Sequence, residues 1–287
     1  MDLSIIIPSY NTKALLARCI HSVVSSLKNS NIPYEVIVVD NASTDGSAEL
    51  MRKKFPQVHL VCNRTNRGYG KANNQAINKA KGKYILLLNS DILVQDDAIG
   101  MLYRFILDKK KIFAGGKLLN EDGSPQPSCG LFYTIPVVAL MLFVKGDYWG
   151  VTRYSPGKPQ RVDWVSGACL IGQKSSFQDV GLFDEDIFMY MEEIELLYRS
   201  YKKNYATFFY PYASFIHTGA ASSGDHKTPV VNIYRGLMYF YRKHQSTMAY
   251  TILRSLLKVK ALAAILLGRI IMRRDIVQTY EEALSIL

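Results

Sequence analysis

The sequence predicts an α/β fold, in which a largely parallel sheet is covered by helices on both faces and is followed by a helical tail. Short apolar runs alternate with segments of helical periodicity over the first 120 residues, and this alternation is typical of strands joined by crossover helices. The apolar runs are continuous, as expected of strands that are buried on both faces. Beyond residue 230 the pattern becomes helical, basic and apolar.

Each element of the first half has its own local signal. The first strand, residues 3–8, is followed by Asn11 or Thr12, either of which can cap a helix. Apolar residues then recur at helical spacing from residue 15 to residue 27. The other elements expected in this half are strands at 35–39, 58–62 and 84–88, a helix at 48–55 ended by Pro56, and a helix from 66 to about 82.

The second half is less regular. Residues 121–130 are expected to form a loop or a hairpin, and the apolar run 162–172 predicts one buried strand. Residues 188–204 predict a helix that starts with acidic residues and ends with basic ones, which suits the helix dipole. Two further short strands are expected at 207–210 and 214–217.

Composition limits the class of protein. Of the 287 residues, 48% are hydrophobic and 21% are charged, so the chain can build a sizeable core and is not a disordered protein. The net charge is +11, and residues 227–287 contain 10 basic but only 3 acidic residues. A basic, apolar tail on a nearly balanced body favours an anionic membrane surface as a partner over nucleic acid.

Cysteine usage and hydropathy indicate a cytoplasmic chain. The four cysteines lack the spacing of zinc or redox motifs, and Cys19 and Cys169 lie in apolar runs, so we expect reduced core thiols. The first residues lack the basic start of a signal peptide. The longest uncharged apolar run, residues 131–144, is 14 residues long, short of the roughly 20 that a membrane span needs. We therefore expect a peripheral protein at the inner face of the cell membrane.

Polar side chains follow the expected strands of the first half. They occur at residues 9–11, 40–43, 66–74 and 89–91. Because ligands of parallel α/β sheets bind beyond the carboxyl ends of the strands, we expect these four segments to converge on one crevice.

Several motifs stand in a fixed order along residues 1–220. They are SIIIPSYN, VIVVDNASTDGS, NRGYGKANN, LLLNSD, WVSGACLI, GLFDEDIFMYMEEIEL and the late His217. In this order they resemble the inverting glycosyltransferases of family 2, which have the GT-A fold, and most of all the bacterial rhamnosyltransferase-like branch. The resemblance implies a Rossmann-like mixed sheet flanked by helices, a nucleotide-diphosphate sugar donor and a metal-dependent transfer of a hexose.

The resemblance implies a nucleotide site at the strand ends. Asp40 either caps the following helix or accepts hydrogen bonds from the base or ribose of the donor, and the resemblance favours the second role. Gly68 would let the backbone approach the ligand, and Arg67 or Lys71 would balance the diphosphate charge unless they form a plain solvated patch. The implied set is Pro8, Ser9, Tyr10, Asn11, Asp40, Asn41, Arg67, Gly68, Lys71, Asn74, Asn89 and Ser90.

Asp91 and His217 are the implied metal ligands. Asp91 occupies the place of the family's Asp-x-Asp motif, where Mg²⁺ or Mn²⁺ would offset the charge of the departing diphosphate; the plainer interpretation is a turn residue. Asn89 departs from the wider pattern, and its implied role is a hydrogen bond to the ribose or to a metal-bound water. In similar enzymes a His at the position of His217 completes the metal shell, whereas a lone His is more often structural.

The acidic cluster at residues 192–195 contains the implied base. Inverting transfer needs one carboxylate to take the proton of the attacking hydroxyl, and Glu193 occupies the family's Asp position, with Glu192 as the alternate. Glu195 fits the plainer role of an acid that favours a helix start. Asp184 is expected to fix the loop ahead of this helix.

Small residues beside a tryptophan are implied to form the wall next to the donor sugar. Gly167 and Ala168 leave room for a pyranose ring, and Trp164 either stacks on a sugar or fills the core. We expect a catalytic domain over residues 1–229 and a basic amphipathic tail over residues 230–287 that favours an anionic membrane surface.

The expected function is transfer of a hexose, with dTDP-rhamnose or a UDP-sugar as donor, to a lipid-linked or polysaccharide acceptor of the bacterial cell surface. A homodimer is compatible with the sequence. Two alternatives stay open: a sugar-phosphate nucleotidyltransferase of related fold, and a membrane-bound scaffold without catalysis.

Overall fold

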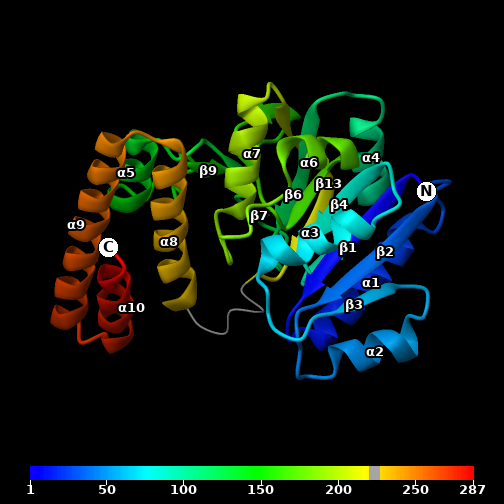
Figure 1. Ribbon diagram of the computed structural model, residues 1–287, viewed down its shortest axis with the longest axis horizontal. Coiled ribbons are helices and arrows are strands. Elements are labelled where there is room, and N and C mark those ends of the chain that lie inside the picture. The colour runs from blue at the N-terminus through cyan, green and yellow to red at the C-terminus, as the bar shows by residue number, and fades with distance from the viewer. Residues whose placement is uncertain (220–226) are drawn as a thin grey trace.

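The computed structural model describes residues 1–219 and 227–287, and its larger lobe is built on a mixed sheet. Within these residues the sheet has ten strands, and its main path runs β10-β13-β6-β12-β4-β1-β2-β3. The four parallel strands at one side are β1 (Leu3–Ser9), β2 (Tyr34–Asp40), β3 (His59–Cys62) and β4 (Tyr84–Leu88). They carry the polar turns of the first half, and Figure 1 shows them together at the N-terminal side.

Antiparallel pairing makes the other half of the sheet mixed. Strand β12 (Cys169–Gln173) runs antiparallel to both β4 and β6 (Ile112–Leu119), and β13 (Ala206–His217) runs parallel to β6. The remaining members of the sheet are β5 (Ile92–Val94), β7 (Pro125–Gln126) and β10 (Gln160–Val162). A separate three-stranded sheet contains β8 (Cys129–Gly130), β9 (Arg153–Tyr154) and β11 (Trp164–Val165).

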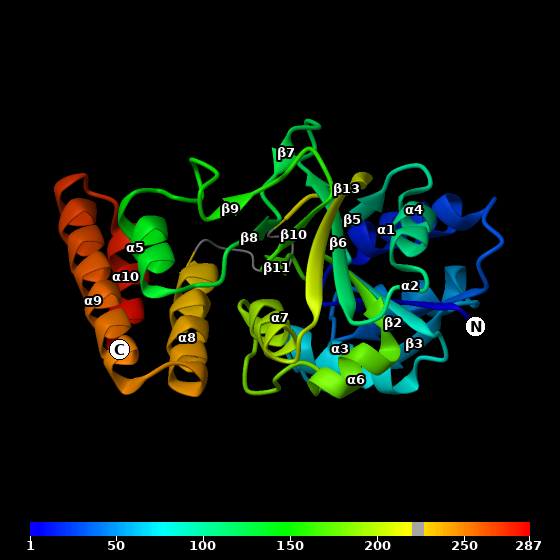
Figure 2. The ribbon, with the colours of Figure 1, turned by 90° about the horizontal axis from the view of Figure 1, so that it is seen from above.

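Helices cover both faces of the large sheet, as Figure 2 shows from above. Alternate residues of one strand face opposite sides, so Ile5 and Ile7 pack in one apolar cluster and Ile6 packs in the other. The first cluster is covered by α1 (Lys13–Leu27), α2 (Ser47–Lys54) and α4 (Ala98–Ile106). The second is covered by α3 (Tyr69–Lys79), α6 (Lys174–Val180) and α7 (Glu192–Lys202).

Four helices form a smaller lobe beside the sheet: α5 (Ile135–Phe143), α8 (Lys227–His244), α9 (Thr247–Ile270) and α10 (Arg274–Ser285). Helix α5 packs against α9 although about a hundred residues separate them in the chain. Helix α8 runs across the predicted boundary at residues 229/230, and residues 220–226 of the predicted catalytic domain lie outside the described residues. In the described part of the chain, no helix combines the length and the apolar character needed to cross a bilayer.

Three sequence-based predictions of elements were wrong in detail. The run 162–172 is not one strand, because the chain turns at residues 166–168 as it leaves the small sheet for the large one. The two strands expected at 207–217 are one strand, β13, with a register shift between Tyr210 and Ser214. The helix expected from residue 188 begins at Glu192, because Tyr190 and Met191 have φ values of 67° and 77° that end a tight loop.

Candidate active site

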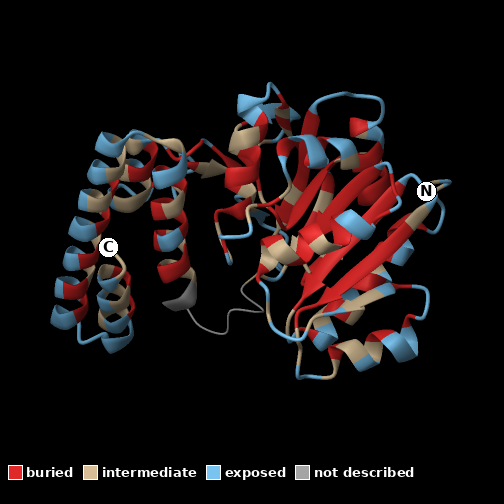
Figure 3. Ribbon diagram, in the orientation of Figure 1, coloured by how far each residue is buried: buried red, intermediate tan, exposed pale blue. Residues whose placement is uncertain are grey.

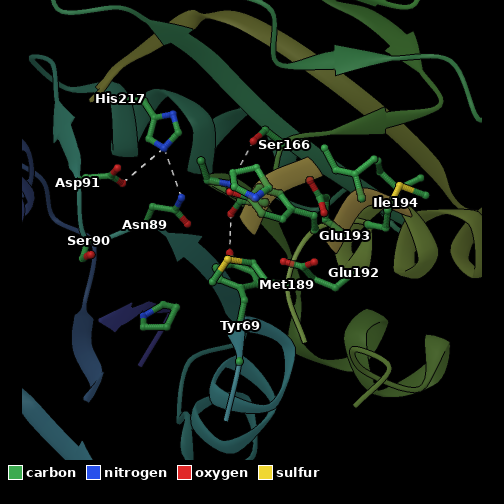
Figure 4. Close-up of a pocket in the computed structure, with 18 of the residues that line it drawn as sticks. Tyr69, Asn89, Ser90, Asp91, Ser166, Met189, Glu192, Glu193, Ile194 and His217 are labelled. Carbon is green, nitrogen blue, oxygen red and sulfur yellow. Dashed lines mark hydrogen bonds and ion pairs between the residues drawn. The ribbon is translucent and has the colours of Figure 1, made fainter. Parts of the chain in front are cut away.

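A cavity of about 510 Å³ lies at the carboxyl ends of β1, β2 and β4. Its walls come from distant parts of the chain, including the start of α7 and the end of β13, and Figure 4 shows their side chains around it. The sequence-predicted residues that line it are Pro8, Ser9, Tyr10, Asn41, Gly68, Asn89, Ser90, Asp91, Trp164, Gly167, Ala168, Glu192, Glu193 and His217.

Five predicted site residues are not among the lining residues: Asn11, Asp40, Arg67, Lys71 and Asn74. Arg67 is exposed and Lys71 is half-buried. The Oδ1 atom of Asn11 accepts a hydrogen bond from the Thr44 backbone N–H at 2.8 Å. The amide of Asn74 holds the loop before α7, since its Nδ2 donates to the Phe183 carbonyl and its Oδ1 accepts from the Phe183 N–H, both at 2.9 Å.

Asp40 lies just behind the cavity wall. It is buried at the end of β2, directly before Asn41, which lines the cavity. Its Oδ2 accepts the Ser43 backbone N–H at 3.1 Å, while its buried Oδ1 has no hydrogen-bond partner. Leaving a buried carboxylate oxygen without a hydrogen bond costs free energy. This oxygen can therefore accept a hydrogen bond from a ligand at the edge of the cavity.

Gly68 is placed by a close approach of two chain segments. Its φ is +81°, and a Cβ here would lie 2.3 Å from the Phe188 carbonyl oxygen. The Gly68 carbonyl accepts a hydrogen bond from Nδ2 of Asn41 at 3.2 Å. The glycine therefore joins the start of α3 to the loop before α7, and both flank the cavity.

A chain of hydroxyl groups fixes the end of β4. The Oγ atoms of Ser9 and Thr12 are 2.9 Å apart, and the Thr12 hydroxyl donates to Ser90 at 2.9 Å. All three side chains are buried. This network holds the turn that presents Asp91.

Asp91 and His217 lie next to each other in the cavity wall. The Asp91 Oδ1 lies 3.4 Å from Nε2 of His217, and Nδ2 of Asn89 lies 3.3 Å from the same nitrogen; both contacts are drawn in Figure 4. The pairing of β13 with β5, in which His217 is opposite Ile92, brings the two residues together.

Gln126 sets the tautomer of His217. The Gln126 Nε2 is within 3.1 Å of the Asn120 Oδ1 and 3.4 Å of the His217 carbonyl oxygen, so it is the donor end of the amide. The Oε1 end accepts from His217 Nδ1 at 2.7 Å. The neutral imidazole therefore carries its proton on Nδ1 and turns the lone pair of Nε2 toward Asp91.

The donor atoms here fit a divalent cation. A carboxylate oxygen and an imidazole lone pair face each other at 3.4 Å, a contact that is unfavourable unless a cation or a proton lies between them. No group of three or more His, Cys, Asp or Glu side chains gathers for a metal anywhere in residues 1–219 and 227–287. A cation held by these two side chains alone would need its other ligands from a bound phosphate or water, as Mg²⁺ sites commonly do.

Glu192 and Glu193 enter the cavity at the start of α7. Burial raises the pKa of Glu192 well above its usual value, and the charge of Glu193 raises it further. Burial also raises the pKa of Glu193, while backbone N–H groups and the nearby Arg153 oppose that rise. Arg153 and these N–H groups therefore favour the ionised form of Glu193, as a general base requires.

Comparison with known proteins decides the family. Residues 4–128 match the model of glycosyl transferase family 2. These residues therefore contain a family 2 glycosyltransferase domain. The glycosyltransferase is 29% identical over 212 residues to the N-acetylglucosaminyl-diphospho-decaprenol L-rhamnosyltransferase of Mycobacterium tuberculosis, covering 67% of this chain and 69% of that one.

Other relatives agree on the family and the fold. A low-salt glycan biosynthesis hexosyltransferase of Haloferax volcanii is 29% identical over 216 residues, covering 71% of this chain and 62% of that one. The solved mannosyltransferase of Pyrobaculum calidifontis, in complex with GDP-Man and Mn²⁺, matches with a TM-score of 0.57 and 16% identity over 99% of this chain and 74% of that one. The GT-A-like fold predicted from the sequence is confirmed.

Sequence reasoning missed several cavity residues of this glycosyltransferase. Tyr69 donates its hydroxyl to the Gly167 carbonyl at 2.6 Å and so fixes the turn that faces Glu193. Gln126, which does not line the cavity but contacts His217, lies in a segment predicted as a loop or a hairpin, and Arg153 belonged to no predicted element. Nothing in the local sequence signals these roles, because each depends on a partner far along the chain.

Trp164 serves the core of the glycosyltransferase. Its side chain is 1% exposed, and its indole N–H donates to the Leu131 carbonyl at 2.9 Å. The Arg153 guanidinium lies over its ring, 5.4 Å from the centroid. Of the two roles left open by the sequence, the structure favours core filling, with the ring also orienting Arg153.

Glu195 fastens α7 to α8. Its carboxylate is fully buried and receives hydrogen bonds from Arg199, Lys243 and His244 at 2.8–2.9 Å. Although burial raises the pKa of Glu195, these partners lower it to about 2. The same Lys243 also pairs with Asp184 in the loop before α7. The acid predicted to be structural therefore anchors the helix that carries Glu192 and Glu193.

Glu195→Gln is expected to lower the free energy of unfolding at neutral pH by about 3 kcal/mol, because it leaves buried cations without their charge partner. Since the folded-state pKa lies near 2 and the usual value is 4.5, this stabilisation is present above pH 4.5 and disappears as the pH falls toward 2. Urea unfolding at several pH values measures the loss. The matched control is Glu49→Gln, whose exposed pair with Lys53 is worth about 0.5 kcal/mol or less; an equal effect of both changes would contradict the anchor.

Proposed function

We propose that this glycosyltransferase moves L-rhamnose from dTDP-rhamnose to a lipid-linked glycan acceptor, with inversion at the anomeric carbon. The observation that carries the proposal is that Asp91, Glu193 and His217, remote in the sequence, line one cavity. The rhamnosyltransferase relative, whose name specifies a diphospho-decaprenol acceptor, supports the choice of sugar and acceptor.

The donor belongs at the strand-end side of the cavity. Asn41 and the segments 8–10 and 89–91 line this side, and they offer backbone groups, hydroxyls and amides that suit a nucleoside diphosphate. The unpaired Oδ1 of Asp40 lies next to Asn41. In this proposal it accepts a hydrogen bond from the base or the ribose once the donor is bound.

In this proposal Asp91 and His217 would hold a divalent cation, which would offset the negative charge of the departing diphosphate. Gln126 keeps the Nε2 lone pair of His217 directed at this position. The mannosyltransferase and GalNAc-transferase structures with a similar fold both contain Mn²⁺, which supports a divalent cation here.

Glu193 takes the proton of the acceptor hydroxyl. In an inverting displacement the hydroxyl attacks the anomeric carbon from the side opposite the diphosphate, and a carboxylate on that side removes the proton as the bond forms. Glu193 lies against Gly167, whose missing side chain leaves space beside the carboxylate. Glu192 keeps its proton more strongly, because its pKa is raised well above the usual value.

A panel of sugar nucleotides with Mn²⁺ tests the proposal. With dTDP-rhamnose and a lipid-linked N-acetylglucosamine acceptor we expect a rhamnosylated product by mass analysis and release of dTDP. UDP-sugars are the alternative donors in the same panel. A nucleotidyltransferase would instead consume a sugar phosphate and a nucleoside triphosphate, and a non-catalytic scaffold would release nothing. Either result would refute the proposed function.

We also propose that the small lobe binds an anionic membrane surface, with residues 1–229 as the catalytic domain and the helices that follow as the membrane-facing unit. A row of α9 side chains at helical spacing, Val259, Leu262, Leu266 and Ile270, is 56–68% exposed. The exposed basic residues Lys258 and Arg269 flank this row. Apolar burial together with attraction to anionic lipid is the basis of interfacial binding.

Leu266→Glu is expected to weaken vesicle binding roughly tenfold or more, because a buried leucine contributes about 1.5–3 kcal/mol. Co-sedimentation with phosphatidylglycerol and phosphatidylcholine vesicles measures it, and we expect binding to the anionic vesicles to fall with added salt. Val24→Glu, a similar change on the exposed side of α1, is the control. Equal binding to both vesicle types would argue against an anionic surface.

A further inference from the structure

One side of the cavity lies away from the strand ends at which the donor is proposed to bind. Opposite the strand ends it is lined by Tyr133, Met141, Asp147, Arg153, Pro229 and Ile233, which we call the distal wall. These residues come from the segment around α5, from β9 and from α8, and all of these lie outside the large sheet. In an inverting displacement the acceptor must arrive from the side away from the diphosphate, so this wall faces the acceptor.

The distal wall is mostly apolar and has two charged side chains, Asp147 and Arg153. The Asp147 carboxylate accepts a hydrogen bond from the Thr152 hydroxyl. Met141, Pro229 and Ile233 offer no hydrogen-bonding side chain, and Tyr133 is buried. A wall that bound only sugar hydroxyls would need several polar partners. Among the described residues that line the cavity, Arg153 is the sole lysine or arginine.

Several N–H donors of the Arg153 guanidinium have no hydrogen-bond partner among the described residues. Within the described chain its guanidinium makes one hydrogen bond, from Nη2 to the Pro127 carbonyl at 3.3 Å, and it forms no ion pair with a carboxylate. Its Nε is buried and has no partner. A guanidinium has five N–H donors, and leaving a buried donor unpaired is costly.

The guanidinium is held in place as well as being unpaired. Trp164 lies beneath it, and the tryptophan is fixed by its own hydrogen bond to Leu131. Its charge acts on Glu193, whose pKa it lowers. Arg153 is therefore an oriented cation close to the carboxylate that meets the acceptor hydroxyl.

We propose that Arg153 binds the phosphate of an acceptor whose hydrocarbon chain lies along Met141, Pro229 and Ile233. The inference rests on the proposed function and identifies how the acceptor is recognised. A planar guanidinium matches two phosphate oxygens, and the apolar side chains suit a hydrocarbon. Helix α5, which supplies Met141, packs on α9, so the distal wall continues toward the lobe proposed to lie on the membrane.

Binding of short amphiphiles tests this directly. With EDTA present to remove metal, the full-length protein is titrated with farnesyl diphosphate, farnesol and inorganic pyrophosphate by calorimetry. We expect farnesyl diphosphate to bind roughly 10–100-fold more tightly than farnesol, as hydrogen bonds to a charged group imply. Pyrophosphate alone should bind weakly, because it lacks the apolar part. Equal binding of farnesol and farnesyl diphosphate would overturn the proposal.

Variants assign the effect to Arg153. Arg153→Met is expected to remove most of the preference for farnesyl diphosphate, and Arg153→Lys to keep part of it. Arg161→Met, a change at an exposed residue of β10 outside the cavity, is the matched control and should bind as the unmodified protein does. Thermal unfolding of each variant verifies the fold, and an unchanged preference in a folded Arg153→Met would refute the assignment.

Kinetics separate acceptor binding from an effect on the base. Arg153→Met should raise the KM for the lipid-linked acceptor at least tenfold, while kcat and metal-dependent donor hydrolysis stay within about threefold. A loss of kcat at unchanged KM would mean that Arg153 acts only by tuning Glu193, and would contradict phosphate binding. If the unmodified protein hydrolyses no sugar nucleotide, the proposed function fails, while the result with farnesyl diphosphate still decides whether Arg153 binds phosphate.

Discussion

Glu193→Gln is expected to lower kcat by roughly 10²–10⁴-fold while leaving donor affinity nearly unchanged. Glutamine keeps the size of the side chain but cannot take the proton from the attacking hydroxyl. In the proposed arrangement the donor lies at the other side of the cavity, which is lined by the strand ends and Asp91. Single-turnover transfer measures the loss, and calorimetry with the nucleoside diphosphate measures donor affinity.

The neighbouring acid is the matched control for this change. The pKa of Glu192 is raised well above its usual value, so Glu192→Gln replaces a protonated, neutral carboxyl group with a neutral amide, and most of the turnover should remain. Since burial raises the pKa of Glu193 above its usual 4.5, the rate should drop as the pH falls through that raised value. The acid limb of the profile should stay at nearly the same pH in Glu192→Gln. Loss of turnover in Glu192→Gln but not in Glu193→Gln would assign the base to Glu192.

The parallel half of the fold could be predicted from the sequence because its signals are local. The continuous apolar run of β1 and the polar turn after it are both visible in a few residues. The mixed half could not be predicted in detail. Strand β12 pairs with β4 and with β6, and pairing between distant segments leaves no periodicity in a single run such as 162–172.

The same difference between local signals and long-range contacts decides which residues of the candidate site could be predicted. Residues at strand ends, such as Asn89 and Asp91, could be assigned to the cavity because the topology places them there. Asn74 shows the limit, since a polar residue on a helix was interpreted as a ligand contact but hydrogen-bonds to the loop at Phe183. Arg153 is the opposite case, a cavity residue that the sequence did not reveal. Its position depends on packing over Trp164, which belongs to another strand.

Asp91→Ala is expected to reduce transfer by roughly 10²–10³-fold or more, and excess Mn²⁺ should not restore it. The change removes the only carboxylate that faces Nε2 of His217 among the described residues. A cation bound by His217 alone would lack the negative ligand that Mg²⁺ or Mn²⁺ prefers. The charge of the departing diphosphate would then be offset poorly, so kcat should suffer more than acceptor binding.

Metal binding gives this prediction a measurement independent of turnover. Titration of Mn²⁺ in the presence of dTDP, followed by electron paramagnetic resonance, should show a bound ion in the unmodified enzyme and none in Asp91→Ala. Asp97→Ala is the control, because Asp97 pairs with Arg104 at the surface, away from the cavity. A second variant tests the hydrogen bond between Gln126 and His217. Gln126→Ala frees the imidazole to change tautomer, so it should weaken Mn²⁺ binding by about 10-fold or more through His217 alone. Undiminished Mn²⁺ binding and transfer in Asp91→Ala would show that the cation, if the reaction uses one, is held elsewhere.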